Sequence, residues 1–208
     1  MSRWLLTLGL GVLSASAWAQ QPVTPADLVG TVTKASTIED RVMRRDSREW
    51  QEKYQSDWLI EFVSKETIRP TFVATIYHPA VTNKLPPAGG GLVTLGRVRE
   101  LSDRGGGQAL WAFDAGVLNN TRTFTAGAVK YTFAITRNGA GFDCTVTVLW
   151  GREVSVPYIS MRSAIDGVWV QLVSAKQSSS SCQIAATDAK RAAPAAVKGA
   201  EPTPKAHN

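Results

Sequence analysis

The sequence predicts an all-β protein, an antiparallel β-sandwich or barrel of about nine strands, with a cleaved signal peptide and a disordered C-terminal tail. Three observations lead to this fold class. Apolar and polar residues alternate with a period of two over residues 129–150. Shorter alternating segments are separated by Gly, Pro, Asn and Asp, at spacings typical of sandwiches and barrels. The 208 residues, of which 44% are hydrophobic and 19% charged, favour one domain or two very small ones.

Residues 1–19 have the organisation of a secretory signal peptide. Arg3 provides a basic start, about ten apolar residues follow, and the segment ends in the small-x-small sequence Ala17-Trp18-Ala19. The apolar run is half as long as the roughly 20 residues that a membrane-spanning helix needs. We therefore expect cleavage after Ala19 and a mature protein, without a membrane span, that is periplasmic or secreted.

The clearest strands are predicted in residues 129–150, which read as one antiparallel hairpin. Asn138-Gly139 interrupts the alternation and accepts the positive φ of a tight turn. One face of the hairpin is Thr-rich and is expected to be exposed. The opposite face is expected to be buried, and its residues are Val129, Tyr131, Phe133, Ile135, Phe142, Cys144, Val146, Val148 and Trp150.

The same alternation, less regular, predicts the other strands of a single domain over residues 20–186. These strands are residues 29–33, 58–63, 71–78, 92–101, 108–114, 154–161 and 168–175. The fourth and fifth flank a Gly-rich turn, and the last two flank Asp166-Gly167, so each pair is expected to form a hairpin. The charged residues 37–54 lack a clear apolar stripe and are either a helix or a polar hairpin.

The C-terminal residues 187–208 are rich in Ala, Pro and Lys and have no large apolar periodicity. This composition predicts a disordered tail. Half of the formal net charge of +6 belongs to this tail and to the signal peptide. The folded part is therefore only mildly basic, and export separates it from nucleic acid, so no nucleic-acid partner is expected.

The two cysteines, Cys144 and Cys182, are predicted to form a disulfide bond, because export leads to an oxidising compartment. Their spacing is unlike the Cys-x-x-Cys arrangement of redox sites. Cys144 belongs to the buried face of the hairpin. The bond is therefore expected to hold a short connector at residues 178–181 and the segment 182–184 against that sheet.

Catalytic motifs are absent from the sequence, which favours a protein that is not an enzyme and predicts no catalytic residue, cofactor or metal site. There is no Gly-x-Ser-x-Gly, His-Glu-x-x-His, P-loop or Ser-x-x-Lys pattern, and His78 is the only histidine outside the tail. Asp57 with Glu61, and Asp114 with Asp143, are the carboxylate pairs considered for glycoside hydrolysis. The first pair lies about 13 Å apart along an extended strand, farther than catalytic carboxylates stand.

Tryptophan is the residue type that points to ligand binding, because an exposed indole ring stacks on sugars and other flat surfaces. Trp58 and Trp150 fall on predicted buried faces and are expected in the core. Trp169 and Trp111 are the predicted ligand-binding residues. Trp169 lies opposite the apolar series of its strand, whereas the alternation around Trp111 leaves its side undecided.

Three functions are consistent with these features. The first is an exported, non-enzymatic β-domain that binds an envelope component, a polymer or a protein partner. The alternative is a small β-barrel that binds an apolar small molecule, which an internal apolar cavity of a few hundred Å³ favours. The second alternative is a hydrolase with an unrecognised carboxylate site, which two carboxyl groups within about 9.5 Å in a cleft favour.

Overall fold

The computed structural model describes residues 21–78, 81–85, 87–100, 107–124, 127–151, 154–157 and 169–187, without the side chains of Val81, residues 155–157 and Trp169. The predicted signal peptide and the tail beyond Thr187 lie outside these residues. Thr187 itself donates a backbone hydrogen bond of 2.9 Å to the carbonyl oxygen of Gly30.

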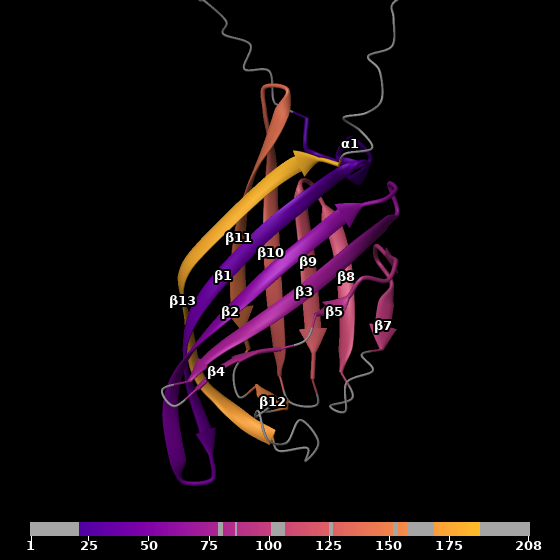
Figure 1. Ribbon diagram of the computed structural model, residues 1–208. Helices are drawn as coiled ribbons and strands as arrows, with labels where there is room; N and C mark the ends of the chain where they lie inside the picture. Colours follow the sequence, from indigo (N-terminus) through magenta and orange to yellow (C-terminus); the bar gives the residue numbers. More distant parts are fainter. Residues whose placement is uncertain are drawn as a thin grey trace, which may run out of the picture.

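The described chain forms two antiparallel sheets and one short helix (Figure 1). The strands of the first sheet, in spatial order, are β12 (Ser155–Pro157), β13 (Trp169–Ala186), β1 (Thr31–Arg45), β2 (Arg48–Phe62), β3 (Thr67–His78) and β4 (Val81–Lys84), with β5 (Ala88–Gly89) and β6 (Val93–Thr94) also paired to β3. The strands of the second sheet are β11 (Gly141–Trp150), β10 (Ala128–Asn138), β9 (Val117–Thr123), β8 (Gln108–Asp114) and β7 (Val98–Glu100).

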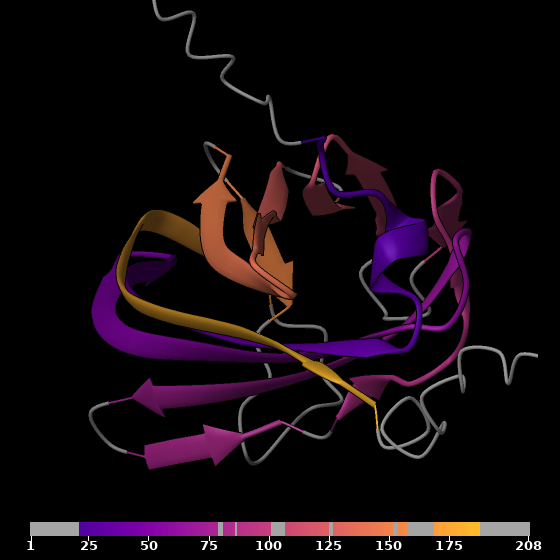
Figure 2. The ribbon, with the colours of Figure 1, turned by 90° about the horizontal axis from the view of Figure 1, so that it is seen from above.

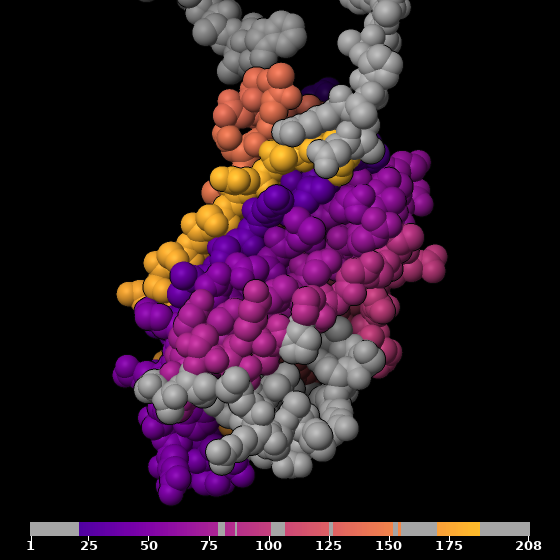
Figure 3. All heavy atoms as spheres, in the orientation of Figure 1, coloured from indigo at the N-terminus to yellow at the C-terminus, as the bar shows by residue number. Residues whose placement is uncertain are grey.

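The two sheets pack face to face, as the view from above shows (Figure 2), and the predicted all-β antiparallel fold is confirmed. Among the described strands no ladder joins one sheet to the other, so the arrangement is a sandwich of two open sheets and not a closed barrel. The outer face of the first sheet presents β13, β1, β2 and β3 as adjoining diagonal bands (Figure 3).

Residues 37–54 form a hairpin of β1 and β2, so the polar-hairpin interpretation is correct and the helix is wrong. The two strands pair from Val32 opposite Glu61 to Arg45 opposite Arg48, and Asp46 provides the turn with a φ of 55°. The apolar stripe of a helix is missing because alternate residues face inward, and several of these, such as Glu39 and Arg41, are charged.

Three other elements differ from the predictions. β13 continues to Ala186, so residues 178–181 are strand and not a connector; backbone pairing with β1 holds this Ser-rich segment. β9 was not predicted, because its sequence is dominated by Asn, Thr and Arg, yet it pairs with β8 and β10. Residues 92–101 divide between β6 of the first sheet and β7 of the second.

The predicted hairpins are confirmed where they are described. β10 and β11 pair from Val129 opposite Trp150 to Asn138 opposite Gly141, and β7 pairs with β8. β12 pairs with the start of β13, while the predicted turn at Asp166-Gly167 lies outside the described residues.

The main core is aromatic and is centred on Trp58, which is 4% exposed. The ring centroid of Trp58 lies 4.5–6.0 Å from those of Phe72, Trp111, Tyr131 and Phe133, which belong to both sheets. Helix α1 (Pro25–Leu28) covers one end of this core with the buried side chain of Leu28. The sheets are thus held together by ring packing at the α1 end of the sandwich.

The predicted disulfide between Cys144 and Cys182 is confirmed, and it joins β11 of one sheet to β13 of the other. The two Cα atoms are 5.4 Å apart. The bond is not the only contact that holds the end of β13, because the ladder with β1 runs from Arg44 to Thr31.

Replacing both cysteines by alanine is expected to lower the free energy of unfolding by about 2–4 kcal/mol, because the chain between them loses its loop constraint. In residues 176–186, the alternate amides that point toward β1 should nevertheless keep slow exchange, since β1 still pairs with them. Urea unfolding and hydrogen exchange measure the two effects. Free exchange throughout residues 176–186 in the double variant would contradict the second expectation.

Candidate functional site

The gap between the neighbouring edges of β11 and β13, which we call the seam, is where the two sheets approach each other outside the core. β11 is the last strand of its sheet, and among the described ladders it pairs with β10 alone. Cys144 and Cys182 close one end of the seam. From there β11 and β13 run alongside each other.

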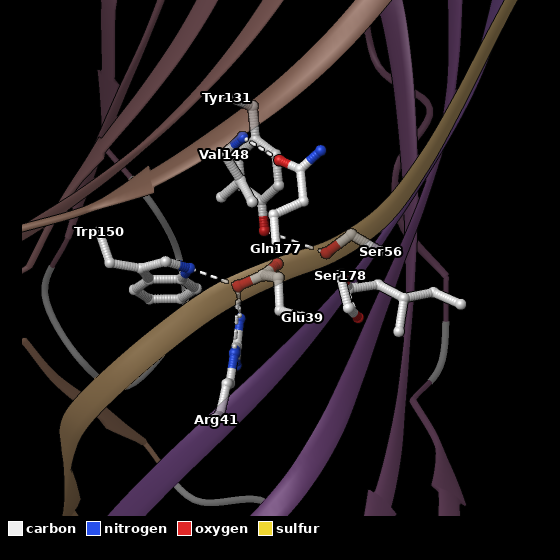
Figure 4. Close-up of polar contacts among 9 residues, drawn as sticks. Glu39, Arg41, Ser56, Tyr131, Val148, Trp150, Gln177 and Ser178 are labelled. Atoms are coloured by element: carbon white, nitrogen blue, oxygen red, sulfur yellow. Dashed lines mark hydrogen bonds and ion pairs between the residues drawn. The ribbon is translucent and has the colours of Figure 1, made fainter.

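Gln177 spans the seam with its side-chain amide (Figure 4). Its Nε2 donates to the carbonyl oxygen of Val146 at 3.2 Å, and its Oε1 accepts from the backbone N–H of Val148 at 2.9 Å. These two backbone groups belong to the edge of β11, where a neighbouring strand would pair. The amide of Gln177 therefore makes the two hydrogen bonds that two neighbouring peptide groups of an additional strand would make.

Beyond Gln177 the seam opens into a hollow of about 450 Å³. Its walls are residues 148–151 of β11 and its end, residues 171–175 of β13, Gln177, and Arg44 from β1. At the far end, the backbone N–H of Leu172 donates to the carbonyl oxygen of Val154 at 2.9 Å. A volume of this size is within the range of ligand-binding pockets.

Trp150 lines the hollow and is held from behind by a buried ion pair. Its indole N–H donates to Glu39 Oε2, which also accepts from the Arg41 guanidinium at 3.1 Å (Figure 4). The guanidinium lies between two rings, 3.4 Å from the centroid of Tyr54 and 4.2 Å from that of Trp150. Cation–π stacking and the shared carboxylate oxygen thus fix the plane of Trp150.

Glu39 is fully buried, and burial raises the pKa of its carboxyl group, against the opposing effects of Arg41 and Trp150. Its Oε1 has no hydrogen-bond partner among the described residues. Nearby, Tyr131 and Ser56 share a hydrogen bond of 3.0 Å, and burial raises the pKa of the Tyr131 hydroxyl. A charged and polar layer therefore separates the aromatic core from the hollow.

A second cation, the half-buried Arg122, lies close to the aromatic core. The guanidinium of Arg122, from β9, lies 5.6 Å from the Trp58 ring centroid and 4.9 Å from that of Phe72. Its charge lowers the pKa of Tyr54, as that of Arg41 does, while burial raises this pKa. Within the described chain, Arg122 Nε and the neighbouring Asn120 Oδ1 have no hydrogen-bond partner.

The predicted tryptophans have different positions. Trp58 is in the core, as expected. Trp111 is 4% exposed and stacks on Phe133 with centroids 6.2 Å apart, so it faces the interior and not an outer surface. The side chain of Trp169 lies outside the described part, and ligand binding by Trp169 and Trp111 stays a prediction. Trp150, expected in the core, is partly buried and lines the hollow.

The structure does not bring together the carboxylate pairs considered from the sequence. Asp57 and Glu61 lie on the outer face of β2, where Glu61 pairs with Arg69 at 2.6 Å. Asp114 and Asp143 are on β8 and β11, and the intervening β9 and β10 put the two strands about 14 Å apart. His78 ends β3, with its ring centroid 6.3 Å from that of Trp50.

Sequence reasoning missed Glu39, Arg41 and Gln177. Glu39 and Arg41 are two positions apart in a charged segment, a spacing that places both on one face of a strand. No comparable signal marks Gln177, because its partners are backbone atoms of β11.

Among the described residues, no cluster of three or more His, Cys, Asp or Glu side chains is arranged to hold a metal ion. No helix in this part of the chain has the length and apolar character to cross a membrane. No family model, curated protein or solved structure matches the chain.

Replacing Arg41 by methionine is expected to lower the free energy of unfolding by about 3–5 kcal/mol at pH 8, because it leaves the buried Glu39 carboxylate without its cation. The loss should be much smaller at pH 4, where the raised pKa lets Glu39 be neutral in the folded protein. Urea unfolding at the two pH values measures the difference.

Adding Glu39→Gln to the Arg41→Met variant should restore most of the stability at pH 8, because no buried charge then lacks a partner. The matched control is Arg69→Met, which removes a surface ion pair with Glu61 and should change stability by about 1 kcal/mol or less. An equal loss at pH 4 and pH 8 for Arg41→Met would show that packing, not charge, is the role of Arg41.

Proposed function

We propose that this chain is an exported, non-enzymatic binding protein that holds an envelope or extracellular partner at the seam. One observation carries the proposal: a hollow of about 450 Å³ opens between two strand edges and is lined by Trp150, whose ring is fixed by Glu39 and Arg41. A rigid amphipathic ring in a hollow is a recognition element, because it offers apolar area at little cost in conformational entropy.

A periplasmic or secreted location is part of this proposal. It is supported by the organisation of residues 1–19 and by the Cys144–Cys182 bond, since structural disulfides persist in oxidising compartments. In such a compartment the partner is an envelope component, a polymer or a protein.

Binding is favoured over catalysis by the arrangement of Glu39. The side chain is fully buried, and one of its oxygens accepts from both Arg41 and Trp150. This geometry suits a group that positions Trp150 better than a group that meets a substrate. An apolar-ligand carrier is less favoured, because the sheets stay open and the rings around Trp58 occupy the space between them.

Photo-crosslinking in the producing cell tests the proposed function. A photoreactive residue at Leu149, which lines the hollow and is 71% exposed, is expected to give adducts in the exported fraction. The matched control is Leu59 on β2, which is 43% exposed and lies away from the seam. The substitution Ala175→Trp enlarges a small side chain that lines the hollow opposite the inward-facing Arg41, so it should fill the hollow and abolish the Leu149 adducts.

Two results would overturn the proposal. One is the absence of adducts from Leu149 in exported protein. The other is an equal yield from Leu149 and Leu59 that Ala175→Trp leaves unchanged, since this pattern indicates unspecific collision and not a site.

A further inference from the structure

We infer, building on the proposed function, that the partner binds the seam as an extended peptide segment, which adds a short strand to the edge of β11 between Gln177 and β12. A peptide ligand of this kind needs a free edge of β11 with the backbone groups of a strand, a seam wide enough to admit it, and walls that suit its side chains.

The Gln177 amide shows that the edge of β11 is prepared. An amide N–H and an amide carbonyl already pair with the carbonyl of Val146 and the N–H of Val148, at 3.2 and 2.9 Å. In an added strand these two bonds come from two neighbouring peptide groups, because the N–H and C=O of one trans peptide point to opposite sides. The Gln177 amide makes both bonds from one group, since one of its N–H bonds and its carbonyl oxygen lie on the same side, and it reaches the edge from β13 across the seam (Figure 4).

The same edge continues into the hollow. In an antiparallel pair the N–H and C=O groups of alternate residues point to the same side of the strand. The carbonyl of Val148 and the N–H of Trp150 therefore point away from β10, as the N–H of Val148 does. Gly151 fits this alternation, because its N–H points the other way and donates to the carbonyl of Ala128 in β10 at 2.8 Å. An entering backbone thus meets an acceptor and a donor in the next register after Gln177.

The width of the seam increases away from the disulfide. The Cα atoms of Cys144 and Cys182 are 5.4 Å apart, which leaves no room for a strand. At Gln177 a whole side chain is needed to reach β11, and beyond it the hollow opens. A strand added to β11 lies about 4.8 Å from it, so it requires this wider part.

The length of the added strand is limited at both ends. Gln177 closes one end, and β12 pairs with residues 169–171 of β13 at the other, followed by the bond from Leu172 to Val154. Residues 173–176 of β13 remain between them. Four residues of extended chain span about 13 Å, so a segment of about this length fits.

The walls favour a segment with apolar residues. Among the described residues that line the hollow Arg44 alone is charged, and it is paired with Glu49. The inward wall is formed by Trp150 and Leu172. Side chains of a strand alternate between two sides, so every second residue of the segment faces Trp150. An apolar residue at these positions buries surface against the indole ring. Backbone pairing with pockets for alternate side chains is the mode of β-strand addition.

Binding of a synthetic peptide tests the inference. The probe is acetyl-Val-Thr-Val-Thr-amide at millimolar concentration, and its binding is followed by shifts in the amide ¹H–¹⁵N spectrum of the intact protein. We expect saturable shifts of the Trp150 backbone and indole N–H signals, and slower exchange of the Trp150 backbone amide. Signals of Lys130 and Thr132, whose strand lies on the other side of β11, should show no protection change.

N-methylation separates strand addition from other peptide binding. Alternate N–H groups of the bound peptide point toward β11, so methylating this set should abolish binding. Methylating the other set should change the dissociation constant by no more than about twofold. Equal effects of the two sets, or shifts that do not saturate, would overturn strand addition.

Substitution of Gln177 provides the matched variant. In the Gln177→Leu variant the new side chain has a similar size, but the Val146 carbonyl and the Val148 N–H lose their partner. A peptide two residues longer should therefore bind this variant more tightly than it binds the native protein. Gln171→Leu, which lines the same hollow away from those two groups, is the control and should not show this gain. A longer peptide that gains nothing from Gln177→Leu would contradict the role assigned to this amide.

Failure of this inference is distinguishable from failure of the proposed function. If Leu149 gives specific adducts but the peptides do not bind, the seam binds a partner by other chemistry and strand addition is wrong. Saturable shifts of Trp150 with chitohexaose but not with the peptide would show that the ligand is a polymer of sugars.

Discussion

The Cys144–Cys182 bond fixes the corner at which two open sheets meet, and the geometry of the seam follows from it. The aromatic core around Trp58 holds the faces of the sheets together at the α1 end but does not determine how their edges lie. β11 is tied to β13 at one point, with Cα atoms 5.4 Å apart, and the hollow lies farther along the same two strands. The side chain of Gln177 extends from β13 to the backbone of β11, and the hollow begins next to this side chain. The covalent tie and the hollow thus lie at different points of the same seam, with Gln177 between them.

The buried ion pair of Glu39 and Arg41 lies where most sandwiches have apolar residues. A buried pair adds little net stability, since desolvation of both groups offsets their attraction, and the raised pKa of Glu39 shows that desolvation dominates for this carboxyl. The pair does give orientation. Arg41 is fixed between Tyr54 and Trp150, and the same carboxylate oxygen receives the indole N–H, so Trp150 has one defined plane. The arrangement is consistent with a layer that costs stability and positions the ring that lines the hollow.

The sequence was informative where side-chain patterns decide structure and uninformative where backbone pairing does. Alternation over residues 129–150 predicted β10, β11 and the inward side of Cys144, because one face of that hairpin is apolar. The Ser-rich end of β13 and the Asn-rich β9 carry no such pattern. β9 is a strand because it pairs with β8 on one side and β10 on the other, and the end of β13 is a strand because β1 pairs with it along its length. At the site, the alternation predicted the inward side of Trp150 but assigned the ring to the core and not to a hollow. Gln177 was not, since a glutamine near the end of a chain says nothing about backbone atoms some thirty residues earlier.

An edge strand with unpaired backbone groups invites association with other strands, and proteins protect such edges by covering or tying them. Here the protection of β11 is graded. The disulfide closes the seam permanently at one end, the Gln177 amide covers it reversibly in the middle, and the hollow leaves the next backbone groups accessible. Exchanging the Gln177 amide for a peptide amide replaces hydrogen bonds by hydrogen bonds of the same kind, so that exchange contributes little free energy by itself. The affinity of a partner strand then depends on the apolar area it buries against Trp150, at about 25 cal/mol per Å². Backbone pairing would set the register of the partner, and the ring fixed by Glu39 and Arg41 would set which sequences it prefers.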